Sequence, residues 1–258
     1  MKTRATLLAS LLLLAGTRIA FAQDALPPLH GQCSLAPGDK PGQVRLELDR
    51  DGGHDHDSDS NVPLQDFTGL TLADFQREGA HLSVSMPGEA GDLTCAGEVH
   101  GLRLSGDFTF TPHPAFVDRM AHLGFTGFTS EKLEACTLFH IESTWVESLQ
   151  SAGVSGMTTD NLIAMRIFRV DADFVRSMAA LGYANLGAEK LIAFAVQGVN
   201  PAEVKQVRAM GYRPTADELI QMRIFKVTPG FIERMKKRGF DNLTIAKLVQ
   251  IRIFNLAE

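Results

Sequence analysis

From His113 onward, apolar and polar positions recur in units of about 29 residues. The phrase "LIAMRIFRV" at 162–170 returns as "LIQMRIFKV" at 219–227 and as "LVQIRIFNL" at 248–256. The five units are 113–141, 142–170, 171–199, 200–227 and 228–256. Each carries a glycine at the same place, namely Gly124, Gly153, Gly182, Gly211 and Gly239. A fixed period of this length is typical of a repeat architecture.

Each unit has the pattern of two short helices joined by a glycine turn. In the last unit, Thr228 and Pro229 are typical of a helix start, and Gly239 is typical of a helix end. Thr244 then begins a second helix, as do the equivalent residues Thr129, Thr158 and Thr215. Helices of about 9–11 residues are marginal alone. We therefore predict that residues 113–258 form an α-solenoid of five stacked helix–turn–helix repeats.

Before the repeats, apolar residues alternate with polar ones at the period of a β-strand. The segments 43–48 and 82–86 show this alternation, and His100-Gly101 fits a two-residue hairpin turn before a last strand. The residues expected on the buried face are Val44, Leu46, Leu48, Leu82, Val84, Met86, Phe108 and Phe110. The predicted fold class is α+β: a small antiparallel β-domain over 23–112 that caps the N-terminal end of the solenoid.

The first 22 residues have the pattern of a secretory signal peptide. Lys2 and Arg4 precede the apolar run "LLASLLLLAG", and Ala20 and Ala22 provide the small residues of a cleavage site. No later apolar run reaches the length of about 18–20 residues that a membrane-spanning helix needs. We expect an exported protein without a membrane span, periplasmic or extracellular in a bacterium.

Charge is distributed unevenly along the chain. Residues 23–112 contain 15 acidic and 5 basic residues, whereas residues 113–258 contain 15 acidic and 17 basic residues. A nucleic-acid-binding protein has a concentrated basic surface, so we expect no nucleic-acid partner. Export also permits disulfides. Cys33 and Cys95 both lie in the acidic half, and the spacing leaves open whether they pair; Cys136 is expected to be a buried thiol.

An Asp/His-rich tract at 49–61 is one candidate for chemistry. Oxygen ligands alternate in it as at the start of a calcium loop, but Ser60 stands where such a loop has glycine, and Asp66 stands where it has glutamate. The histidines suit a transition metal instead, and a third interpretation is a solvated loop that protects a sheet edge. The candidate ligands for a divalent cation are His54, Asp55, His56, Asp57 and Asp59.

A second candidate is a row of arginines at one position of three units, Arg166, Arg223 and Arg252. Stacked repeats would align them as a patch that binds carboxylates of a partner. The alternative is structural, because a cation in the last turn of a helix complements the helix dipole. His113, His122 and His140 fall in or beside the first unit, where structural or solvated roles are the default.

Catalytic motifs are missing from the sequence. It contains no His-Glu-x-x-His, no Gly-x-Ser-x-Gly and neither glycine-rich nucleotide-binding motif. We therefore expect no enzyme, no catalytic residue and no organic cofactor. An enzyme of unknown type would need a polar pocket where the sheet meets the repeats, lined by residues such as His100, His113 and His122.

The segments "GDFTFTPHPAFV" at 106–117 and "VPLQDFTGLT" at 62–71, with the repeated "Leu-Ile-x-Met-Arg-Ile-Phe", resemble a known family. They are similar to the extracytoplasmic repeat region appended to penicillin-sensor-type membrane metallopeptidases, and to stand-alone exported repeat proteins. The peptidase part has no counterpart here. The resemblance implies a sensing or docking module that binds an unidentified protein or peptide on the helical-repeat surface. A divalent-metal-binding protein that uses the 49–61 loop is the alternative.

Overall fold

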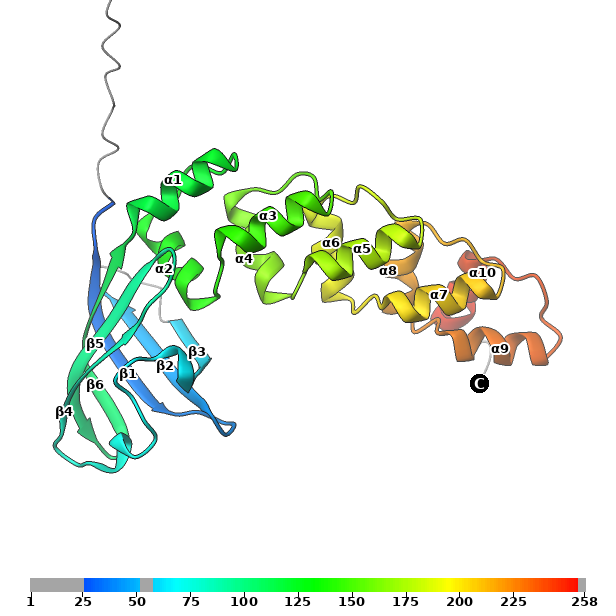
Figure 1. The fold of residues 1–258 in the computed structure, drawn as a ribbon. Helices are drawn as coiled ribbons and strands as arrows, with labels where there is room; N and C mark the ends of the chain where they lie inside the picture. The colour runs from blue at the N-terminus through cyan, green and yellow to red at the C-terminus, as the bar shows by residue number, and fades with distance from the viewer. Residues whose placement is uncertain (1–25, 52–57, 255–258) are drawn as a thin grey trace, which may run out of the picture.

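The computed structural model describes residues 26–51 and 58–254, which form an antiparallel sheet followed by a row of helices (Figure 1). The α+β fold class is confirmed in this respect. The strands are β1 (Leu29–Pro37), β2 (Gln43–Arg50), β3 (Ser58–Pro63), β4 (His81–Met86), β5 (Gly91–His100) and β6 (Arg103–Pro112). The helices are α1 (Pro114–His122), α2 (Ser130–Leu138), α3 (Ser143–Ser151), α4 (Thr159–Ile167), α5 (Ala172–Ala180), α6 (Ala188–Val196), α7 (Pro201–Ala209), α8 (Ala216–Ile224), α9 (Pro229–Lys237) and α10 (Ile245–Ile253). Two short 3₁₀ turns, Leu64–Asp66 and Asp74–Gln76, lie between β3 and β4.

The six strands lie in the order β3-β2-β1-β6-β5-β4. Strand β1, which the sequence pattern did not predict, lies inside the sheet and pairs with β2 on one side and β6 on the other. The β5–β6 hairpin is shifted by one residue from its predicted place. His100 pairs with Arg103, so the two turn residues are Gly101 and Leu102, both with positive φ. Positive φ at both places is what a two-residue hairpin turn requires.

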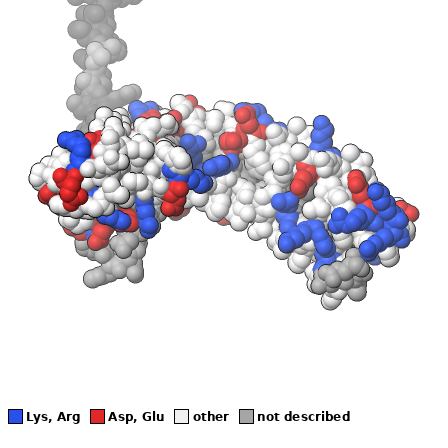
Figure 2. Space-filling view, turned by 90° about the horizontal axis from the view of Figure 1, so that it is seen from below, with Lys and Arg blue, Asp and Glu red and all other residues white. Residues whose placement is uncertain are grey.

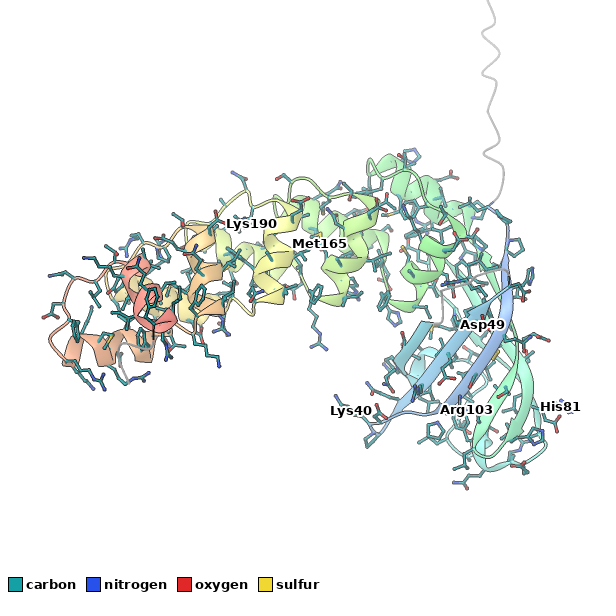
Figure 3. All side chains as sticks on the ribbon, turned by 180° about the vertical axis from the view of Figure 1, so that it is seen from behind. Lys40, Asp49, His81, Arg103, Met165 and Lys190 are labelled. Atoms are coloured by element: carbon teal, nitrogen blue, oxygen red, sulfur yellow. A yellow bond between two sulfur atoms is a disulfide. The ribbon has the colours of Figure 1, made fainter. Side chains whose placement is uncertain are left out.

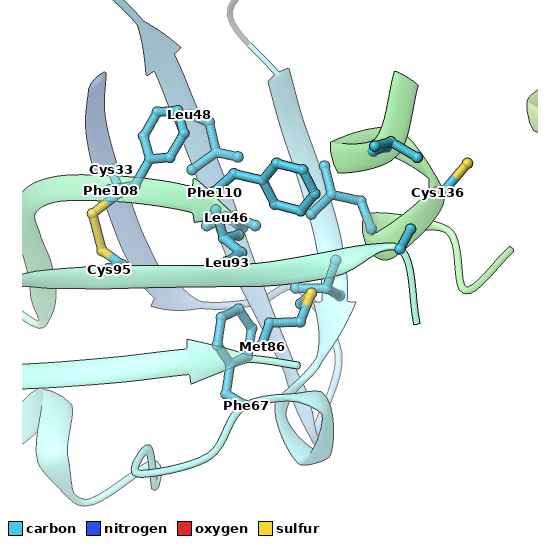
Figure 4. Close-up of a cluster of buried hydrophobic side chains, with 14 of the residues drawn as sticks. Cys33, Leu46, Leu48, Phe67, Met86, Leu93, Cys95, Phe108, Phe110 and Cys136 are labelled. Atoms are coloured by element: carbon cyan, nitrogen blue, oxygen red, sulfur yellow. A yellow bond between two sulfur atoms is a disulfide. The ribbon is translucent and has the colours of Figure 1, made fainter. Parts of the chain in front are cut away.

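The sheet is sharply curled across β1, β6 and β5. Gly97 and Gly106 pair with each other, and a Cβ on either would come within 2.0 Å of a backbone oxygen of the opposite strand. Glycine therefore permits the close approach. The curl brings the Cα atoms of Cys33 and Cys95 to 6.1 Å, although β6 lies between their strands, and the two residues form a disulfide (Figure 4).

Side chains on the concave face of the sheet form a continuous core with the first helices. All eight residues expected on the buried face contribute to it, Leu82 only partly buried. Phe116 and Met120 of α1 and Leu133 and Cys136 of α2 belong to the same core. The outer face is polar, and Arg103 there forms an ion pair with Glu47 at 2.8 Å (Figure 3). The sheet is therefore joined to the helical part by packing and not by a linker.

Local signals start and end the helices where the sequence predicts. The hydroxyl groups of Thr129, Thr158, Thr215, Thr228 and Thr244 accept hydrogen bonds from backbone N–H groups of the helices they precede. The glycine that follows the first helix of each unit has φ between 84° and 96°, a conformation that favours a residue without Cβ. Each helix is 9 residues long.

The helices form two parallel rows that extend away from the sheet (Figure 1). Along one row, α1, α3, α5, α7 and α9 contact their neighbours in turn; along the other, α4 contacts α6, α6 contacts α8 and α8 contacts α10. Helix α2 packs on β5 and β6. Two further buried clusters continue the core along the rows to α10. Within the described part of the chain, no helix has the length and apolar character that a membrane crossing requires.

Candidate functional site

A line of aliphatic side chains is exposed on the second helix of four units. Ile167, Val196, Ile224 and Ile253 occupy the last position of α4, α6, α8 and α10, and each is 47–50% exposed. We call these four residues the apolar column. Because their helices contact one another in sequence, the four side chains recur at the spacing of packed helices, about 8–10 Å. Phe168 and Phe254, which follow two of them, are exposed as well.

Core packing explains the recurrence of only some residues in the repeated segment Leu-Ile-x-Met-Arg-Ile-Phe. Leu162 and Met165 of α4 are fully buried, and their equivalents Leu219, Met222 and Leu248 are buried as well, whereas Ile251 of α10 is partly buried. The isoleucine of the same phrase points away from that core in every copy. In the first unit the equivalent residue, Leu138, is only 7% exposed because it joins the core shared with the sheet. The apolar column therefore begins where the sheet ends.

A row of cations runs beside the apolar column. Two residues after Ile167, Val196 and Ile224, the chain adopts a left-handed conformation, with φ of 57° at Arg169, 67° at Gly198 and 54° at Lys226. His140 has φ of 51° at the equivalent place of the first unit. Glycine is the residue that this conformation favours, and other residues are strained there. Two of the four places carry Arg169 and Lys226, which we call the cation row, and another carries His140.

Arg166, Arg223 and Arg252 take a position between neighbouring units. The Nε atom of Arg166 donates a hydrogen bond to the backbone oxygen of Phe139 at 3.0 Å, and its guanidinium lies 5.4 Å from the centre of the Trp145 ring. Arg252 donates to the oxygen of Lys226 and lies 4.4 Å from the Phe231 ring.

Arg223 makes the same kind of hydrogen bond to a backbone carbonyl, but it contacts a carboxylate instead of an aromatic ring. It donates to the oxygen of Gln197, and it forms an ion pair with Glu203, which replaces the aromatic residue of the other units. All three arginines thus satisfy carbonyl groups at the C-terminal end of the preceding second helix, which have no partner within their own helix. This contact with the preceding unit differs from the structural role predicted from the sequence, which was to complement the dipole of the arginine's own helix. A role in partner binding stays a prediction.

A cleft of about 620 Å³ lies where the sheet meets the second unit. Its walls come from Asn61 of β3, the end of α2, Trp145 of α3 and the end of α4. Ile167, the first member of the apolar column, lines it, as do Arg166 and Arg169. We call it the junction cleft. Its volume falls in the range of about 300–1,000 Å³ that ligand sites have.

The histidines singled out from the sequence are not brought together. His113 contacts Asp92, His122 donates to the backbone oxygen of Asp118, and His140 contacts Asp66 at 2.8 Å. His100 lies at the opposite end of β5 from the helices, beside Glu78 and Glu98. Hydrogen bonding to the Glu78 carboxylate, with the charge of Glu98, raises the pKa of His100. Of these four histidines only His140 lines the junction cleft, so no group of imidazoles is assembled there by the part of the chain that the structure describes.

Most of the candidate metal ligands, namely His54, Asp55, His56 and Asp57, lie outside the described residues. The interpretation of 49–61 as one loop is wrong, because β2 extends to Arg50 and β3 begins at Ser58. Asp59 lies in β3, with its backbone paired to Glu47. Asp66 is engaged by His140. Among the residues of 26–51 and 58–254, no group of three or more His, Cys, Asp or Glu side chains is arranged to hold a metal ion.

Glu134 is a buried acid that no sequence pattern indicated. It is fully buried on α2, where its Oε2 atom accepts a hydrogen bond from Arg50 Nε at 2.7 Å. Its Oε1 atom has no hydrogen-bond partner among the residues that the structure describes. Burial raises the pKa of the Glu134 carboxyl, and the ion pair with Arg50 only partly opposes this shift.

The basic residues of the repeats gather at the distal end. Residues 200–254 contain 11 Lys and Arg against 5 Asp and Glu, whereas residues 113–199 contain 6 against 9. Figure 2 shows the Lys and Arg side chains concentrated over this end of the helical rows. The charge is therefore acidic at the sheet and basic at the far end.

Comparison of the chain with protein-family models, curated proteins and solved structures found no match. The resemblance to exported repeat regions therefore stays a prediction, and the function has to be argued from the described surface.

Proposed function

We propose that the chain is an exported, non-catalytic interaction module whose helices form a solenoid of five repeats. Its partner is a protein or peptide segment that lies along the apolar column. The exposed aliphatic residue recurring at the end of four second helices carries the proposal. Single exposed apolar residues are ordinary on a protein surface, but an aligned set of them marks an interaction site.

The shape and charge of this surface favour a macromolecular segment over a small metabolite. The four residues of the apolar column, at about 8–10 Å from one to the next, span a distance that an extended peptide segment can cover and a small metabolite cannot. The cation row beside them favours a partner with acidic residues near its apolar ones. Stacked repeats in general provide extended binding surfaces of this kind.

Site-specific photo-crosslinking in the producing cell tests the proposal. A photoreactive amino acid would replace Ile224 in one variant and Leu102 in another; Leu102 is 53% exposed at the far end of the sheet and serves as the matched control. We expect a defined cross-linked product at position 224 that is absent at 102. We also expect this product to disappear when Val196 and Ile253 are changed to Ser. Equal products at both positions, or none at 224, would contradict the proposal.

A further inference from the structure

We infer that the junction cleft binds the C-terminal carboxylate of an extended peptide whose apolar side chains lie on the apolar column. The inference rests on the proposed function and adds to it the conformation, the direction and the end group of the ligand. Two observations carry it, the termination of the apolar column at the cleft and the charges in the cleft, together with the spacing expected for packed helices.

The spacing of the apolar column fits a polyproline II helix. Packed helices are about 8–10 Å apart, and a polyproline II helix advances about 9.3 Å in three residues, which form one full turn. Every third side chain of such a peptide would therefore meet one member of the column. A β-strand places side chains on one face at about 6.6–6.8 Å, which does not match. A peptide of about 12 residues in this conformation would cover the four units.

The apolar column ends at the junction cleft. Ile167 is its last member on the side of the sheet and also lines the cleft. The next equivalent residue, Leu138, is buried in the core shared with the sheet, and Asn61 of β3 forms the opposite wall. A peptide on the column therefore meets the sheet at this point. The arrangement suits the end of a chain better than a segment that continues.

The charges in the cleft favour a carboxylate end over an amino end. Arg166 and Arg169 both line it. Among the described residues that line it, the one acid is Asp171, which accepts a hydrogen bond from the backbone N–H of Phe174 as the N-cap of α5. Arg166 is held in place by Phe139 and Trp145, while Arg169 is exposed and has no acidic partner among the described residues. A guanidinium group in this situation is suited to bidentate contact with a carboxylate.

The backbone conformation at Arg169 does not require an arginine, so the side chain can be removed without a cost in folding. With φ of 57° the position is one that glycine occupies without strain, and glycine does occupy it in the third unit as Gly198. Strain of this kind persists at functional positions. Arg169→Gly is therefore expected to stabilise the fold, or to leave it unchanged, while it weakens binding.

Synthetic peptides test the inference. The probe has about 12 residues, with Leu at every third position and Pro and Glu between, so that it favours polyproline II. One version ends in a free carboxylate and the other in an amide. Calorimetry with the mature wild-type protein should show that the free carboxylate binds at least about tenfold more tightly. The same comparison is then made with Arg169→Gly and with Lys226→Gly. Lys226→Gly has the same backbone effect but lies outside the cleft.

We expect Arg169→Gly to abolish the preference for the carboxylate without lowering the Tm, and Lys226→Gly to retain the preference. Equal binding of the two peptides by wild type, or a preference that survives Arg169→Gly, overturns the inference. If both peptides bind equally and Ile224→Ser removes binding, the apolar column stands and only the cleft assignment fails. If neither peptide binds, this inference fails as a whole, and the cross-linking experiment decides the proposed function separately.

Discussion

Removal of the disulfide between Cys33 and Cys95 should strongly destabilise the sheet. The bridge spans 62 residues of sequence and joins β1 to β5 across β6. A loop of this length, when closed in the unfolded chain, lowers its conformational entropy by an amount worth about 4 kcal/mol at 25 °C. The double change Cys33→Ala and Cys95→Ala removes the constraint and two small buried side chains. We expect the free energy of unfolding to fall by about 3–5 kcal/mol.

Urea unfolding followed by circular dichroism measures this loss in the variant, with the wild type reduced by dithiothreitol as a second comparison. Cys136→Ala is the control because its thiol is not part of the bridge. Burial raises the pKa of Cys136 to about 12, so the native protein should also resist alkylation by a maleimide. An unfolding midpoint that is the same for oxidised and reduced protein would refute the reasoning, since it would mean that the bridge does not constrain the unfolded chain.

Three further predictions concern polar contacts. The pKa of Glu134 is raised in the folded protein above its ordinary value of 4.5. Its contribution to the free energy of unfolding is therefore fully present below pH 4.5 and is lost as the pH rises through the folded-state pKa. Glu134→Gln should remove this decline in urea titrations run across pH 4–7. Glu89 accepts hydrogen bonds from Ser143 at the start of α3 and pairs with Arg119, so Glu89→Ala should lower the free energy of unfolding by about 1–2 kcal/mol. Glu98→Ala, at a partly exposed glutamate of the sheet, should lower it less. Arg252→Ser should lower the free energy of unfolding, measured by thermal unfolding, by about 1 kcal/mol or less. A larger loss would show that the contact of Arg252 with the preceding unit stabilises the fold more than a cation at a helix end does.

The helical part could be predicted closely because its signals are local. A threonine before a helix and a glycine after it act on the residues next to them, so their positions in the sequence are sufficient. Strand β1 was not predicted, although Cys33 and Leu35 alternate with polar residues. Prolines at its ends and Gly31 within it are unfavourable strand signals, and they concealed a strand whose partner β6 lies far along the chain.

The candidate site could not be predicted in the same way. The sequence shows that Ile167 and its equivalents recur, but a repeated residue can face either the core or solvent. Which of these holds depends on how neighbouring helices contact one another. The junction cleft likewise depends on the meeting of β3 with α2 and α4, which is a tertiary contact. The sequence does not determine the role of Arg166 for the same reason, because the carbonyl partner of this arginine belongs to another unit.

The core shared by the sheet and α1 fixes the N-terminal end of the row of helices to the sheet. Loss of the sheet would expose Phe116, Met120 and Leu133 at once, whereas loss of the last unit exposes only the face that it covered. We therefore expect gain or loss of a unit to be tolerated at the distal end and not beside the sheet. Under the proposed mode of binding, each added unit would extend the bound peptide by one turn of about three residues.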